Sequence, residues 1–344
     1  MLTARPSRLG QVIAYFASLL TLLAFVAGCS SNPLDSAPPT IAPAQPAVSP
    51  PAQDPAGVVR PLGGRPQSAL FDAGSQQLVV LSPAGDTAGP ASVAVLGTQG
   101  AARVITLPGP ATAMTGDGQG TVYLSGRDGY VTLNLGNGQS AATTVEGGHE
   151  FTAIARRADG RLVLGTADGA VYALAADGAV ANRNKIFARV DALATQGNTT
   201  VVLDRGQTSV TTIGPDGRAA QSLRAGEGAT TLAADPQGRA LVADTRGGQL
   251  LVYGVDPLIL RQAFPVRQAP YGLAGSRNLT WVSQTGSNTV IGYDLSTGIP
   301  VEKVRYPTVQ QPNSLAYDDA SDTLYVVSGS GAGVQVIERA GKRP

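Results

Sequence analysis

The stretch "FTAIARRADGRLVLGTADGAVYALAADGAVANRNKIFAR" at residues 151–189 decides the fold. Short runs of Val, Leu, Ile and Ala alternate in it with the turn signals "RADG" and "ADG". Asp and Gly favour hairpin turns because they tolerate left-handed backbone conformations. The spacing predicts four short antiparallel strands, which read "FTAIA", "RLVLGTA", "AVYALA" and "RNKIFAR".

The first of these strands carries a motif that recurs along the chain, with an apolar residue at its third position. The seven occurrences place at that position Leu70, Met114, Ile154, Leu193, Leu232, Leu273 and Leu315. Neighbouring occurrences are therefore 39 to 44 residues apart. A four-stranded unit of about 40 residues, repeated radially, is typical of a β-propeller blade. A linear solenoid is the competing architecture, but its units are usually shorter and it needs polar end caps.

The residues beside the apolar one support a radial arrangement. They are mostly small, as Ala153 and Ala155 illustrate, and small side chains suit strands that crowd around an axis. The seventh unit stops one strand short at Pro344, and "GVVRPLG" at residues 57–63 can supply that strand and remove two exposed edges. We therefore predict an all-β fold over residues 56–344: a seven-bladed β-propeller of four-stranded blades, closed by an N-terminal strand that completes the last blade.

The first 28 residues have the pattern of an export signal. Arg5 and Arg8 precede an uncharged, mostly apolar run at residues 9–27 that ends in small residues. "VAGC" at 26–29 resembles a bacterial lipobox, in which the cysteine is acylated and becomes the first mature residue. The resemblance implies a signal peptide over 1–28, a lipid such as palmitate on Cys29, and a location on the extracytoplasmic face of the cell membrane. An uncleaved anchor is the alternative, because about 20 apolar residues can span a bilayer.

Residues 29–55 follow the signal and are rich in Pro, Ala and Ser. Such a composition cannot bury enough apolar surface to offset ordering, so we predict a disordered, extended tether. At roughly 3.1 Å per residue it would hold a domain up to about 80 Å from the membrane. Because Cys29 is the sole cysteine, we expect no disulfides, and a net charge of +1 argues against a nucleic-acid partner.

Catalytic motifs are missing from the sequence. It has one histidine, His149, and contains no "GxSxG" elbow, "HExxH" or Walker loop. The remaining candidates lie near the starts of inner strands, where a propeller has its axial mouth. These candidate ligand-binding residues are His149, Glu150, Asp191, Tyr271 and Asn313. Glu150, Asp191 and Asn313 offer oxygen ligands, but only Asp191 and Asn313 share the first motif position. A hard cation needs six or more oxygens, so we expect neither a metal nor another cofactor.

The last two units also resemble a known family. "WVSQTGSNTVIGYDLSTG" at 281–298 and "QPNSLAYDD" at 311–319 are similar to repeats of the YVTN family of β-propellers, and the similarity fades toward the first three units. The whole chain is similar to propeller-bearing lipoproteins of actinobacteria. The wider set includes gluconolactonase-like propellers, which hold a divalent cation at the axial mouth, and streptogramin-lyase-like enzymes. The resemblance therefore implies a fold more firmly than an activity.

Two functions follow from these patterns. The first is a lipid-anchored, extracytoplasmic, non-catalytic binding or scaffold module whose partner is a protein or another component of the cell envelope. The second is a gluconolactonase-like or streptogramin-lyase-like enzyme with its site at the axial mouth. Convergence of three or more carboxylate or amide oxygens would favour the enzyme, whereas a channel lined by Ala, Thr and Ser would favour the binding module. The sequence leaves the oligomeric state open.

Overall fold

The computed structural model describes residues 39–84, 89–147 and 150–342. The predicted signal peptide, Cys29 and the first part of the predicted tether lie outside the described residues, as does His149. Thr40–Pro344 form one compact unit, and all the strands belong to it. Among the described residues, no helix has the length and apolar character needed to cross a membrane.

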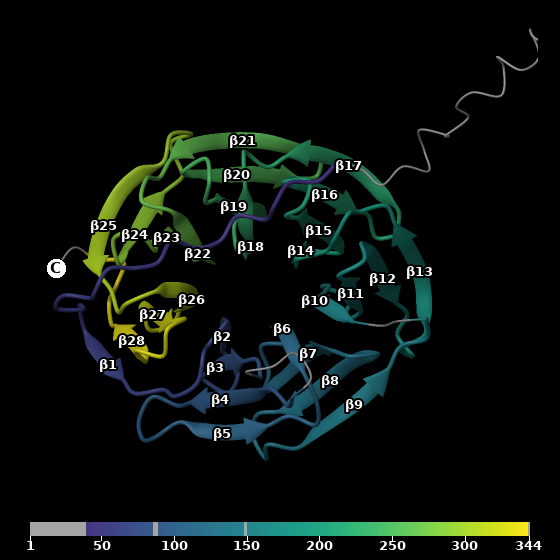
Figure 1. Cartoon of the computed structure of the whole chain (residues 1–344), viewed down its shortest axis with the longest axis horizontal. Helices are drawn as coiled ribbons and strands as arrows, with labels where there is room; N and C mark the ends of the chain where they lie inside the picture. Colours follow the sequence, from purple (N-terminus) through teal and green to yellow (C-terminus); the bar gives the residue numbers. More distant parts are fainter. Residues whose placement is uncertain (1–38, 85–88, 148–149, 343–344) are drawn as a thin grey trace, which may run out of the picture. The chain divides into compact units, whose positions relative to one another are not determined.

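Twenty-eight strands form seven four-stranded sheets in the described part of the chain, and the sheets stand as blades around a central axis (Figure 1). The first four blades comprise β2 (Ser68–Asp72), β3 (Gln77–Ser82), β4 (Ser92–Leu96) and β5 (Arg103–Thr106); β6 (Ala111–Gly116), β7 (Thr121–Gly126), β8 (Gly129–Asn134) and β9 (Ser140–Thr144); β10 (Phe151–Arg156), β11 (Leu162–Thr166), β12 (Ala170–Leu174) and β13 (Val180–Lys185); β14 (Ala192–Gln196), β15 (Thr199–Asp204), β16 (Ser209–Ile213) and β17 (Ala219–Arg224). The last three comprise β18 (Ala229–Asp235), β19 (Arg239–Asp244), β20 (Gln249–Val255) and β21 (Leu258–Pro265); β22 (Pro270–Gly275), β23 (Thr280–Gln284), β24 (Thr289–Asp294) and β25 (Val301–Pro307); β26 (Pro312–Asp318), β27 (Thr323–Ser328), β28 (Val334–Ile337) and β1 (Val58–Arg60).

The predicted repeat is confirmed. All seven copies of the motif lie on the innermost strands, which are β2, β6, β10, β14, β18, β22 and β26. In the third blade the outer strand covers Val180–Lys185, three residues earlier than predicted. Phe187 causes the difference, because it leaves the sheet edge to be buried against the fourth blade beside Val202 and Ile213.

Closure of the ring by an N-terminal strand is also confirmed. β1 pairs antiparallel with β28, with Val58 opposite Val336 and Arg60 opposite Val334. Gly57 begins this strand at φ +72°, and a Cβ there would lie 2.2 Å from the Val336 carbonyl oxygen. Only glycine can therefore bring the chain onto the open edge of the last blade.

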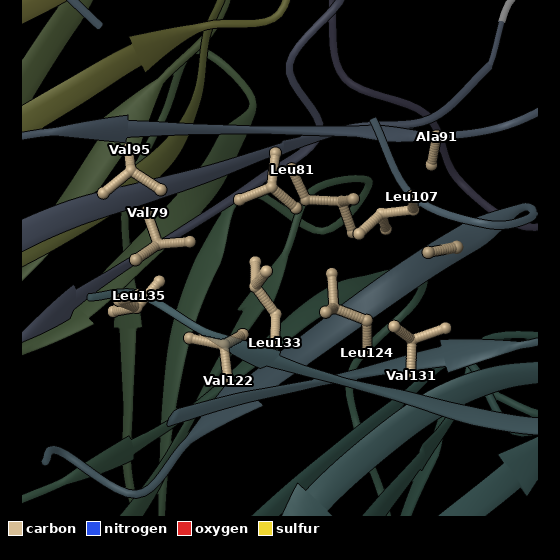
Figure 2. Packing of buried hydrophobic residues seen from close by; sticks show 12 residues of the cluster. Val79, Leu81, Ala91, Val95, Leu107, Val122, Leu124, Val131, Leu133 and Leu135 are labelled. Atoms are coloured by element: carbon tan, nitrogen blue, oxygen red, sulfur yellow. The ribbon is translucent and has the colours of Figure 1, made fainter. Parts of the chain in front are cut away.

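The apolar core lies between neighbouring blades. Figure 2 shows the contact between the first two, where Val79 and Leu81 of β3 face Leu124 of β7 and Leu133 of β8. All four side chains are fully buried. At about 25 cal/mol per Å² of apolar surface, repeated contacts of this kind are the main source of stability in a chain without disulfides.

Residues 41–50, here called the strap, differ from the predicted disordered tether. They lie extended across the face of the fourth to seventh blades, where Figure 1 shows them as a purple trace. Ile41 N donates to the Gly206 oxygen at 2.7 Å, Ala47 N to Thr285 Oγ1 at 3.0 Å, and Asn288 Nδ2 donates to the Pro50 oxygen at 2.7 Å. Ala44 and Ser49 are buried. Hydrogen bonds to the backbone, rather than apolar side chains, hold this segment in place.

Candidate functional site

The axial mouth is built by the register of the inner strands. Each inner strand begins on the same face of the ring, and because blade strands alternate in direction, the loops between second and third strands lie on that face too. A cavity of about 330 Å³ opens there. All seven blades contribute to its lining, which is dominated by small residues such as Ser68, Ala69, Ala113, Thr230 and Ala233.

Asp191 lies in this cavity with its carboxylate already engaged. Arg189 Nε donates to both carboxylate oxygens, at 2.7 and 2.8 Å, and the Arg205 backbone N donates to Oδ2 at 2.9 Å. The Asp191 side chain is only 7% exposed. A carboxylate that accepts three hydrogen bonds, two of them from a cation, has few lone pairs left for a metal ion. Its role here is to fix the loop that carries Arg205.

Asn313 lines the same cavity on the opposite side of the ring, in the seventh blade. Its Oδ1 accepts a bond of 3.0 Å from Gln311 Nε2, which also donates to the Ala47 oxygen of the strap at 2.9 Å. Asn313 thus supports the network that binds the strap.

Tyr271, at the first motif position of the sixth blade, forms part of the cavity wall. Burial raises the pKa of its hydroxyl above the usual range, and the nearby Arg205 guanidinium partly opposes that change. The hydroxyl makes no hydrogen bond to any residue the structure describes, whereas its backbone oxygen accepts one from Thr231. At neutral pH Tyr271 therefore offers a protonated hydroxyl to the cavity.

Glu150 does not join the other candidates. It lines a separate pocket of about 200 Å³ together with Arg127, opposite which it forms a β-bridge. It lies two residues before Thr152, which holds the first motif position in the third blade, and is therefore out of register with Asp191, Tyr271 and Asn313. The described residues contain no group of three or more His, Cys, Asp or Glu placed to hold a metal ion.

Arg205, which the inner-strand motif does not predict, lines the cavity next to Asp191 and Tyr271. It lies in the loop between β15 and β16 of the fourth blade, on the face of the ring where the inner strands begin. Asp204 fixes this loop by accepting bonds from Ala188 N at 2.8 Å and Gln207 N at 3.0 Å. The sequence does indicate that this loop is a repeated feature of the blades. "DRG" at 204–206 and "DTRGG" at 244–248 place equivalent Asp residues 40 positions apart.

Comparison with known proteins places the chain by its fold. No protein-family model and no curated protein matches the sequence. Similar solved structures include a hydrazine synthase of Kuenenia stuttgartiensis (13% identity, TM-score 0.66, 85% of this chain and 98% of that chain covered). They also include a catalytically inactive histidine-to-alanine variant of virginiamycin B lyase from Staphylococcus aureus with quinupristin (11%, TM-score 0.66, 81% and 97%). A third is U3-55K (12%, TM-score 0.70, 84% and 100%). At such identities the likeness shows the β-propeller fold alone.

Proposed function

We propose that this protein is a non-catalytic binding or scaffold module, displayed at the cell envelope by a lipid anchor. The observation that carries the proposal is the state of the polar groups at the axial mouth. Asp191 is neutralised by Arg189, and the Asn313 amide is bonded to Gln311. The rest of the cavity is lined mainly by Ala, Ser, Thr and Leu. Such a mouth can hold a ligand but offers no free acid–base pair for catalysis.

The enzymatic alternative is supported less well. The similar lyase is inactive as a histidine-to-alanine variant, so that enzyme depends on a histidine. This chain has one histidine, His149. Among the described residues lining the axial cavity, the Asp191 carboxylate is engaged by Arg189, so the protonated Tyr271 hydroxyl has no free carboxylate base beside it. A metal-assisted hydrolase would instead need several converging oxygens, and Asp191 is already bonded by two arginines.

The strap limits how far a lipid anchor on Cys29 would hold the ring from the membrane. Ile41 is bonded to the ring and follows Cys29 by twelve residues. Twelve residues span at most about 40 Å when fully extended. The lipid anchor would therefore hold the ring at about half the distance that a free tether up to residue 55 would allow.

The anchor is tested by Cys29→Ser in the full-length chain. We expect the wild-type protein to partition into detergent and the variant to remain in the aqueous phase, because acyl chains supply the membrane affinity. Ser30→Ala is the matched control and should partition like the wild type. Unchanged partitioning of Cys29→Ser would refute the lipoprotein assignment.

The binding role is tested with the anchored wild type and with purified residues 39–344. Cross-linking in intact cells should attach the anchored wild type to a specific envelope component, and purified residues 39–344 should compete for that component in an extract. A component that free ring protein cannot displace, or no cross-link at all, would contradict the proposed role.

A further inference from the structure

Arg205 carries the one uncompensated charge among the described residues that line the axial cavity. Among the described residues lining the cavity, only Asp191 and Arg205 carry charge. Arg189 neutralises Asp191 at 2.7 Å, whereas no carboxylate lies within ion-pair distance of Arg205 in the described structure. The field inside the cavity is therefore positive, even though the chain as a whole is almost neutral.

The donors of Arg205 are only partly used. Nη2 donates to the Ala44 oxygen of the strap, while Nε is buried and has no partner. Nη1 makes no hydrogen bond to a described residue and is not among the buried atoms, so it is available to donate to an oxygen in the cavity. Guanidinium groups also present their donors in a fork that matches the paired oxygens of a carboxylate or phosphate.

Neutral donors surround this cation. The Tyr271 hydroxyl and the hydroxyls of Ser68 and Ser314 line the cavity, and none of the three bonds to a described residue. A hydroxyl can donate to an anion, and Tyr271 adds an aromatic surface beside it. The cavity thus combines one fixed positive charge, several uncommitted donors and an aromatic wall.

We infer that the axial cavity binds a small organic anion, a carboxylate or a phosphate monoester, through Arg205 with Tyr271 beside it. The inference goes beyond the proposed envelope-binding role and requires neither the lipid anchor nor a protein partner. It assigns the cavity a ligand class opposite in charge to the divalent cation of gluconolactonase-like propellers.

The experiment titrates purified residues 39–344 with benzoate, phenyl phosphate and benzamide, followed by ligand-observed NMR and calorimetry. Benzamide is the neutral counterpart of benzoate and has almost the same shape. We expect at least one of the two anions to bind at least tenfold more tightly than benzamide, because only an anion forms a charge-assisted hydrogen bond with Arg205. Preference for benzoate would identify carboxylates as the ligand class, and preference for phenyl phosphate would identify phosphate monoesters.

Arg246 provides a matched control for substitution of Arg205. Its Nη2 donates to the strap at the Ala42 oxygen at 2.7 Å, as Arg205 does at Ala44, but Arg246 does not line the cavity. Arg205→Gln should abolish the preference for the anion, Arg205→Lys should keep part of it, and Arg246→Gln should change affinity less than twofold.

Two results would overturn the inference. One is equal binding of benzamide and both anions, including no binding of any of them. The other is an equal loss of anion affinity in Arg205→Gln and Arg246→Gln, which would trace the effect to the strap. Cross-linking to an envelope component is a separate readout, so failure here and failure of the proposed binding role can be distinguished.

Discussion

Removal of residues 39–63 should lower the free energy of unfolding by several kcal/mol and the melting temperature by well over 5 °C. The truncation removes β1, which leaves the edge of β28 unpaired and the ring open. It also removes Arg60, whose guanidinium donates to Gly97 O at 2.6 Å and Gly100 O at 2.8 Å, and the buried side chain of Leu62. Burial of one leucine is worth about 2 kcal/mol, and each lost hydrogen bond about 1 kcal/mol.

A shorter truncation separates the strap from the closing strand. Deletion of residues 39–51 leaves β1 intact. It removes the backbone oxygens of the strap that accept hydrogen bonds from the side chains of Arg205, Arg246 and Gln311. We expect an intermediate loss of about 2 kcal/mol, because the ordering of the strap offsets much of its hydrogen bonding. Urea unfolding of residues 39–344, 52–344 and 64–344 should give stabilities in that order. Equal melting temperatures for the longest and shortest chains would contradict closure by β1.

Asp244→Ala should destabilise the ring by about 3–5 kcal/mol. The Asp244 carboxylate is fully buried and accepts bonds from Glu227 N at 3.0 Å, Gly228 N at 2.8 Å and Gly247 N at 3.0 Å. Alanine would leave three backbone donors without an acceptor inside the protein. Asp244→Asn should cost less, since its amide keeps one accepting oxygen.

The control for this variant is Asp216→Ala. Asp216 also accepts a backbone bond in a turn, from Arg218 N at 3.1 Å, but it is exposed to water. We expect its loss to cost less than about 1 kcal/mol in urea unfolding, because water can replace the carboxylate. Similar losses for the two variants would show that Asp244 does not hold the loop between blades.

Much of the fold could be predicted from the sequence because blade packing repeats a local pattern. The recurring apolar residue packs against a neighbouring blade in every unit, toward the preceding blade from Met114 to Leu315 and toward the second blade at Leu70. Its spacing along the chain therefore predicts the architecture. The strap could not be predicted in this way. Its contacts are made mainly by backbone atoms. The composition of "IAPAQPAVSP" at 41–50 therefore does not distinguish a bound segment from a free one.

The candidate site was predictable only where strand register controls it. Asp191, Tyr271 and Asn313 share the first motif position and line one cavity, whereas Glu150 lies outside that register and lines another pocket. Arg205 belongs to a different strand pair and reaches the axis through the path of a loop. Sequence spacing within the inner strand carries no information about such a residue, nor about the pairing of Asp191 with Arg189.

Whether the axial mouth binds or catalyses is tested most directly by calorimetric titration of residues 39–344 with Ca²⁺, Mg²⁺, Mn²⁺ and Zn²⁺, combined with assays of lactone hydrolysis and quinupristin cleavage. Because Asp191 is held by Arg189 and Arg205, we predict no metal binding tighter than about 100 μM and no turnover of either substrate class. Micromolar metal binding that Asp191→Ala abolishes, accompanied by turnover, would contradict the non-catalytic role and establish the enzyme.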